Sequence, residues 1–199
     1  MTNNLIVNTK NLQADLDWLE EVIDRRFKFT FTREYIDSST YENKKYNDIE
    51  EIGPPDLQED GSTYAQFVYQ NELNFENRLL LILSLTTHIS PHFLDRHLAG
   101  KYDEFKIKGS KSLNELGGIT SENYRGFIPT GLTWLFLLAG HSLQKRIEML
   151  ASINENHLFI KDGIMMFDPT HPQEPVLSGA IGINPDWLRL LTIGDIQIS

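Results

Sequence analysis

The apolar run Leu79–Leu85 most constrains the fold of this 199-residue chain. It reads LLLILSL, so a helix through it is apolar on nearly every side. A helix of this kind lies in the middle of a core, because none of its faces is suited to water. The run is too short to cross a bilayer, which takes about 20 residues. Asn74 is a suitable N-cap with Glu76 in the first turn, so we expect a central buried helix to begin there.

The chain ahead of this helix predicts a long amphipathic helix. Apolar residues recur at spacings of three and four, which is typical of one buried helix face. They are Leu12, Leu16, Leu19, Ile23 and Phe27. We expect the acidic residues of this helix to lie on its opposite side.

Residues 33–60 predict an irregular acidic arm. They hold nine acidic and three basic residues, and Pro54-Pro55 forbids a regular helix there. The arm is interpreted either as a solvated loop or as a docking segment for a basic partner. Its tyrosines and isoleucines favour packing against the rest of the chain.

The stretch Gly117–Gly140 is rich in glycine and leads into an apolar helix. Its glycines match neither the G-x-x-x-x-G-K-S/T phosphate loop nor the G-x-G-x-x-G dinucleotide fingerprint. We therefore expect them to allow a tight, close-packed entry into a buried helix. Thr130 is the predicted N-cap of that helix, and Gly140 its end.

The last third of the chain predicts a change from helices to a small β ribbon. Ser142 is the expected cap of a second helix, with Leu143, Ile147 and Leu150 as one stripe. Asp162-Gly163 lies between two short apolar runs, which is a hairpin signal. VLSGAIGI (176–183) reads as a further strand, and Asn184 followed by Pro and Asp starts a final helix.

These elements predict a mainly α fold with a small β ribbon (α+β). We expect a helical bundle followed by a winged-helix-like unit, because a helix pair, a hairpin and a return strand occur in that order. The predicted boundaries are 1–60, for the N-terminal helix and acidic arm, and 61–199, for the helical and winged-helix-like domain. One compact unit containing both is the alternative.

Composition narrows the classes of function. The net charge is −10, which disfavours nucleic acid and anionic membranes as partners. The chain has no cysteine, so disulfides, thiolate metal sites and a cysteine nucleophile are excluded. The N-terminus carries no apolar segment of secretory length, and we expect a soluble cytoplasmic protein.

Few residues are candidates for chemistry. His88, His92 and His97 lie close in sequence near Asp95, but Pro91 breaks the helical spacing that a shared metal would need. Capping or core hydrogen bonding is the expectation for His88. We predict no catalytic, cofactor-binding or metal-ligating residue.

Four residues are the partner-binding candidates: Arg125, Phe127, Tyr41 and Tyr46. A guanidinium such as that of Arg125 can hold a carboxylate or phosphate through two hydrogen bonds. The alternative interpretation of Arg125 is an ordinary surface arginine, and that of Phe127 is a core anchor.

Three stretches in this order resemble the N-terminal region of a group of bacterial AAA+ ATPases. They are NFENRLLLILSLTTHISPHFLD, ELGGI…YRGFIPTGLTWLFLLAG and FIKDGIMMFDPTHPQEPVLSGAIGINPDWLRLLTIG. These ATPases are encoded with phage-tail-like contractile injection systems, and in them this region contains a winged-helix-like domain and precedes the ATPase module. The resemblance covers Leu12 to Gly194, and the order GG…GFxPTG…FLLAG is its most specific part.

The resemblance implies a non-catalytic N-terminal protein-binding domain. It would recruit a substrate or partner for the assembly or remodelling of a contractile injection apparatus. The family's Walker A lysine, Walker B acids and sensor residues have no counterpart here, so ATP and magnesium are expected only in a downstream ATPase module. This chain would then be a piece of a longer protein or a stand-alone relative.

Two other functions stay open at this point. A winged-helix DNA-binding regulator would need a basic recognition helix, for which the candidate offers Lys145 and Arg146. A small hydrolase of unknown type would need a nucleophile and base, which no spacing in the sequence indicates.

Overall fold

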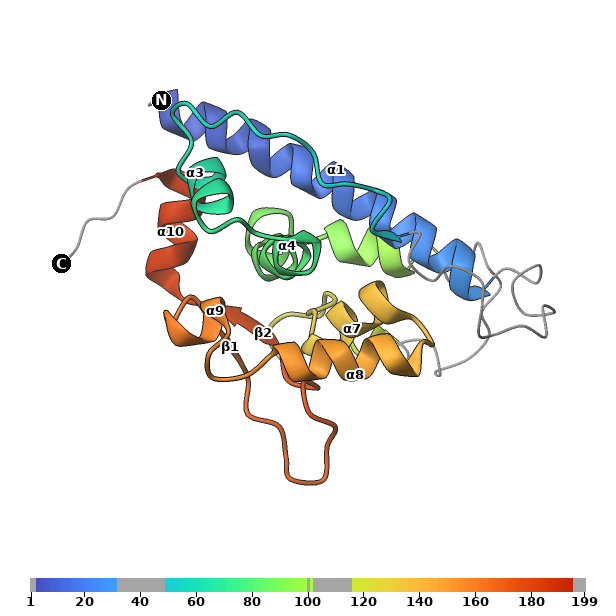
Figure 1. Cartoon of the computed structure of the whole chain (residues 1–199). Coiled ribbons are helices and arrows are strands. Elements are labelled where there is room, and N and C mark those ends of the chain that lie inside the picture. Colours follow the sequence, from blue (N-terminus) through green and yellow to red (C-terminus); the bar gives the residue numbers. More distant parts are fainter. Residues whose placement is uncertain (1–2, 32–48, 100, 102–115, 195–199) are drawn as a thin grey trace.

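The fold is mainly helical with one small antiparallel sheet, as the sequence predicts. A computed structural model describes residues 3–31, 49–99, 101 and 116–194 (Figure 1). The helices are α1 (Asn3–Phe31), α3 (Thr63–Gln70), α4 (Phe75–Ile89), the π-helical turn η2 (Asp95–Ala99), α7 (Gly131–Ala139), α8 (Leu143–Ser152), α9 (Leu158–Lys161) and α10 (Pro185–Ile193). The strands are β1 (Met165–Phe167) and β2 (Ile181–Ile183).

Helix α4 is the centre of the fold, as its apolar run predicts. Every residue of the segment 79–86 is buried, and Figure 1 shows α4 between α1 on one side and α7 with α8 on the other. The hydroxyls of Ser84 and Thr86 donate to carbonyls one turn earlier in the helix, at 2.7 and 2.6 Å. The Asn74 side chain accepts the N–H of Asn77, which confirms the predicted N-cap.

Helix α1 buries two parallel stripes of side chains. The first is the predicted apolar stripe, Leu12, Leu16, Leu19, Ile23 and Phe27. The second has the same spacing of three and four but is largely polar: Asn8, Asn11, Asp15, Trp18, Val22 and Arg26. The expectation that the acidic residues of this helix lie on its exposed side is therefore wrong for Asp15, because a second layer of chain covers that stripe.

Arg26 joins α1 to the end of α7. Its buried guanidinium donates from Nε to the carbonyl of Leu137 at 2.8 Å and from Nη2 to that of Leu138 at 2.7 Å. The last carbonyls of a helix have no intrahelical partner and form the negative end of its dipole, so a cation stabilises them. Gly140, the first residue after α7, has a φ of +50°, and a Cβ there would lie 2.8 Å from the guanidinium.

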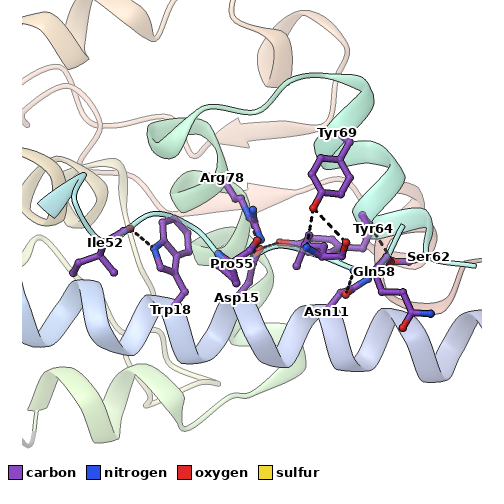
Figure 2. Close-up of polar contacts among 12 residues, drawn as sticks. Asn11, Asp15, Trp18, Ile52, Pro55, Gln58, Ser62, Tyr64, Tyr69 and Arg78 are labelled. Atoms are coloured by element: carbon purple, nitrogen blue, oxygen red, sulfur yellow. Dashed lines mark hydrogen bonds and ion pairs between the residues drawn. The ribbon is translucent and has the colours of Figure 1, made fainter. Parts of the chain in front are cut away.

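The described part of the acidic arm is the layer that covers the second stripe of α1. Residues 49–62 run alongside α1 (Figures 1 and 2). The Trp18 indole donates to the carbonyl of Ile52 at 2.9 Å. The Asn11 amide donates to the carbonyl of Gln58 at 2.8 Å and accepts its N–H at 3.0 Å. Ile49, Ile52 and Leu57 are buried, so this part of the arm is packed as its isoleucines predict.

The rest of the arm, residues 33–48, lies outside the described ranges. The division at residue 60 therefore stays a prediction. Within the described residues, one core cluster extends from Leu12 in α1 to Leu191 in α10.

The glycine-rich stretch ahead of α7 is a close-packed turn. Ile119 and Ile128 exchange backbone hydrogen bonds at 3.0 and 2.9 Å. A Cβ on Gly118 would lie 2.0 Å from the Phe127 ring, and one on Gly117, whose φ is +71°, would lie 2.3 Å from the Leu132 Cβ. The expectation that these glycines allow close packing is thus confirmed.

The predicted caps around this turn are also confirmed. Thr130 accepts N–H groups of the first turn of α7 and forms a capping box with Thr133. Gly140 ends α7, and the Ser142 hydroxyl accepts the N–H of Lys145 in α8.

The β ribbon lies later than the sequence predicts. The hairpin expected at Asp162-Gly163 is wrong, because the first apolar run forms α9 and Gly163, at a φ of +62°, follows it. β1 instead pairs antiparallel with β2, from Met165↔Ile183 to Phe167↔Ile181, across the loop 168–180. β2 is shorter than the predicted strand, and Asn184 caps α10 as expected.

His157 explains why this apolar run begins as a helix. Its Nδ1 accepts the N–H of Phe159 at 3.3 Å as the cap of α9, while Nε2 lies 3.0 Å from Oδ1 of Asn77. These partners suit a neutral ring protonated on Nε2. Burial also lowers the pKa of His157.

Replacing Gly118 with Ala should destabilise the fold by about 1–3 kcal/mol, because the new methyl group overlaps the Phe127 ring. Urea unfolding followed by circular dichroism measures the change. Gly53→Ala is the matched control, since a Cβ there has no neighbour within 4 Å. Equal effects of the two substitutions would contradict the close-packed turn.

Protonation of His157 should make stability depend on pH. A lowered pKa in the folded state means that its contribution is present above the ordinary histidine pKa and is lost as pH falls through the lowered value. The free energy of unfolding should therefore fall from about pH 7 to about pH 5, and fall less in His157→Asn, which keeps a capping side chain. Burial also lowers the pKa of His88, but His88 is present in both proteins, so the difference isolates His157. Parallel curves for the two proteins would refute this role.

Candidate functional site

Helix α8 carries an apolar stripe that faces outward. Leu143 is 72% exposed, Ile147 57% and Leu150 40%. They are spaced i, i+4 and i+7, so they share one face of the helix. We call these three residues the α8 stripe. Single exposed apolar residues are ordinary, but several on one helix face form a patch on which a partner can dock.

The neighbouring helix fixes the direction of this stripe. α7 is buried on nearly all sides, including Trp134, Leu135, Phe136 and Leu137, so it occupies the core. α8 packs on α7 from outside through Met149, the one residue of α8 that is buried. Figure 1 shows α8 on the face of the molecule away from α1.

The two cations of α8 are engaged with the protein itself. Lys145 Nζ lies 2.8 Å from a Glu50 oxygen and 3.1 Å from a Glu76 oxygen. Burial acts to lower the pKa of Lys145, but the two carboxylates outweigh it and raise the pKa. Arg146 Nε donates to the carbonyl of Gly140 at 2.8 Å. Neither cation is fully exposed, and the exposed residues of α8 are the α8 stripe with Gln144, Glu148, Ala151 and Ser152.

A second candidate is the buried cluster of Asp15, Tyr64 and Arg78 in Figure 2. Arg78 donates from Nε and Nη2 to the two Asp15 oxygens, at 3.0 and 2.5 Å, and from Nη2 to the carbonyl of Pro55 at 2.8 Å. The Tyr64 hydroxyl also donates to Asp15. The Arg78 guanidinium lies 5.9 Å from the centre of the Trp18 ring. The cluster thus joins α1, α3, α4 and the arm.

This cluster is structural. Asp15 and Tyr64 are 0% exposed and Arg78 is 3% exposed, so no substrate reaches them. Burial raises the pKa of Asp15, while the hydrogen bonds and charge of Arg78 act in the opposite direction. Burial and the Asp15 charge raise the pKa of Tyr64 well above its ordinary value, which keeps its hydroxyl as a donor. Polar groups in a core are retained when each has its partners, as here.

The predicted partner-binding residues do not form one site within the described residues. Arg125 is exposed on the turn ahead of α7. Phe127 is 6% exposed and its N–H donates to Asp95 at 2.8 Å, which makes it a core anchor. Tyr41 and Tyr46 lie outside the described residues.

The three histidines that lie close to Asp95 in the sequence do not share one partner. His92 Nδ1 lies 3.9 Å from Asp95, His97 Nδ1 lies 3.3 Å from Glu20, and His88 is exposed. In the described ranges, no three His, Cys, Asp or Glu side chains are grouped so that they could hold a metal ion.

The chain matches no family model, no curated protein and no solved structure. None of the helices in the described ranges is long and apolar enough to cross a membrane. The case for a function therefore rests on the sequence and on the geometry of the α8 stripe.

Replacing Asp15 with Asn should destabilise the protein by about 3–5 kcal/mol, because it leaves the Arg78 charge buried without its counter-ion. Urea unfolding monitored by tryptophan fluorescence reports the loss. Asp17→Asn is the control on the exposed side of the same helix and should change stability by less than about 0.5 kcal/mol. The double variant Asp15→Leu with Arg78→Met should recover much of the loss, and failure of Asp15→Asn to destabilise would refute the role of the ion pair.

Proposed function

We propose that this chain is a non-catalytic protein-binding domain, and that it forms the N-terminal region of a AAA+ ATPase of a bacterial contractile injection system. The exposed α8 stripe is the observation that carries protein binding, because partners commonly dock on an apolar helix face. The three stretches that resemble these ATPases support the family assignment.

The unit that presents α8 is winged-helix-like. α7 and α8 form consecutive packed helices, and the β1–β2 ribbon follows them. Thr130, the residue before α7, forms an antiparallel β-bridge with Ala180, the residue before β2. A third short segment is therefore paired with the ribbon. In this interpretation α8 stands where a recognition helix would stand, and the loop 168–180 takes the place of the wing.

The chemistry of α8 favours a protein partner over duplex DNA. A DNA-recognition helix presents cations to phosphates and base edges. Here Lys145 is held by Glu50 and Glu76, and Arg146 by the carbonyl of Gly140. The net charge of −10 opposes DNA further.

In this proposal the chain supplies recognition and a downstream module supplies chemistry. ATP and magnesium bind the ATPase module, and this domain recruits a substrate or partner for assembly or remodelling of the injection apparatus in the cytoplasm. No residue of this chain is assigned a catalytic role.

The test uses the whole chain as bait, in wild-type form and as Ile147→Glu and Val176→Glu. Val176 is 70% exposed, outside α8, and is the matched control. Lysate from the organism that encodes the chain is passed over each bait, and captured proteins are quantified by mass spectrometry. Components of a contractile injection apparatus or its ATPase should be retained by wild type and Val176→Glu and reduced about tenfold or more on Ile147→Glu.

Two results would contradict the proposal. Capture of such components that is unaffected by Ile147→Glu would remove α8 from the binding surface. Binding of duplex DNA by the wild-type chain, weakening steeply as salt rises, would favour the DNA-binding alternative.

A further inference from the structure

The spacing of the α8 stripe suits one kind of occupant. Leu143 and Leu150 lie seven residues apart, which places the stripe along about 10 Å of helix. Apolar residues at i, i+4 and i+7 are the pattern by which one amphipathic helix packs along another. A short helix of a partner, with its own apolar stripe, would bury these three side chains together.

Of the three charged residues of α8, the exposed one is a carboxylate. Arg146 and Lys145 are both held by the protein, while Glu148 is exposed on α8 itself. Glu155, three residues beyond the end of α8, is also exposed, whereas the Glu50 carboxylate is paired with Lys145. The last turn of α8 carries no basic residue, so its negative dipole end is not neutralised by its own side chains.

From this geometry we infer that the α8 stripe receives an amphipathic helix of a partner protein, and that lysine or arginine residues beside that helix's apolar face lie opposite Glu148 and the C-terminal end of α8. The inference rests on the proposed protein-binding function and adds the chemistry of the partner. Complementary charge of this kind sets partner choice and the rate of encounter more than the total affinity.

A second copy of this chain fits the stripe less well. In a two-fold dimer the same surface meets itself, so the Glu148 carboxylates of the two copies would lie on facing surfaces. Each copy also carries a net charge of −10, which opposes association. A cationic partner helix removes both costs.

The test uses two fluorescent helical peptides with the same apolar stripe, one flanked by lysines and one by glutamates. Each is titrated with the full chain, and binding is read by fluorescence anisotropy. The lysine peptide should bind about tenfold tighter or better, and the difference should shrink between about 50 mM and about 500 mM salt. Ile147→Glu should weaken binding of the lysine peptide by about tenfold or more, whereas Val176→Glu should not.

Glu148→Lys separates the charge inference from docking itself. It should narrow or reverse the preference for the lysine peptide while leaving the apolar stripe intact. If the two peptides bind equally, or if Glu148→Lys changes nothing, the charge inference fails, although sensitivity to Ile147→Glu would still support docking on α8.

Other outcomes overturn the inference outright. If neither peptide binds, or if Ile147→Glu does not change peptide binding, the inference that a partner helix docks on the α8 stripe is wrong. The capture experiment then decides separately whether α8 binds a protein. A concentration-dependent dimer in sedimentation experiments that Ile147→Glu abolishes would assign the stripe to a second copy.

Discussion

The ion pair between Asp15 and Arg78 is the polar constraint around which α1, the arm and α4 pack. An arginine keeps its proton in a protein, so its charge at the start of the central helix needs a partner in the core. Asp15 is that partner. The guanidinium also donates a hydrogen bond to the carbonyl of Pro55, which holds the arm over α1. The polar stripe of α1 thus fixes one contact of α4, and the apolar core packs around the other residues of that helix.

The direction of the α8 stripe follows from constraints on the opposite side of the helix. Met149 is the buried side chain of α8, and Lys145 reaches two carboxylates, one from the arm and one from α4. Arg146 is held at the end of α7. These contacts fix the rotation of α8 about its own axis, so the apolar stripe has no core to enter.

The starts of α4, α7, α8 and α10 were predictable from their N-caps. Asn74, Thr130, Ser142 and Asn184 each accept a backbone N–H from the first turn of the helix that follows. The polar stripe of α1 has the same spacing as the apolar one and carried a usable signal, but polar residues are ordinarily assigned to water. The exposure of the α8 stripe was not predictable from the sequence. The spacing of apolar residues shows that they share one face of a helix, but it does not show whether another part of the chain covers that face. The prediction of a hairpin at Asp162-Gly163 was wrong because the apolar run before it forms α9, which His157 caps.

The acidic composition and the open stripe support each other physically. An exposed apolar face on a neutral protein invites association with another copy of itself. Like charge on every copy opposes that association at long range, where apolar contact has no influence. In the docking that we propose, the same net charge opposes a second copy and attracts a cationic helix to the α8 stripe.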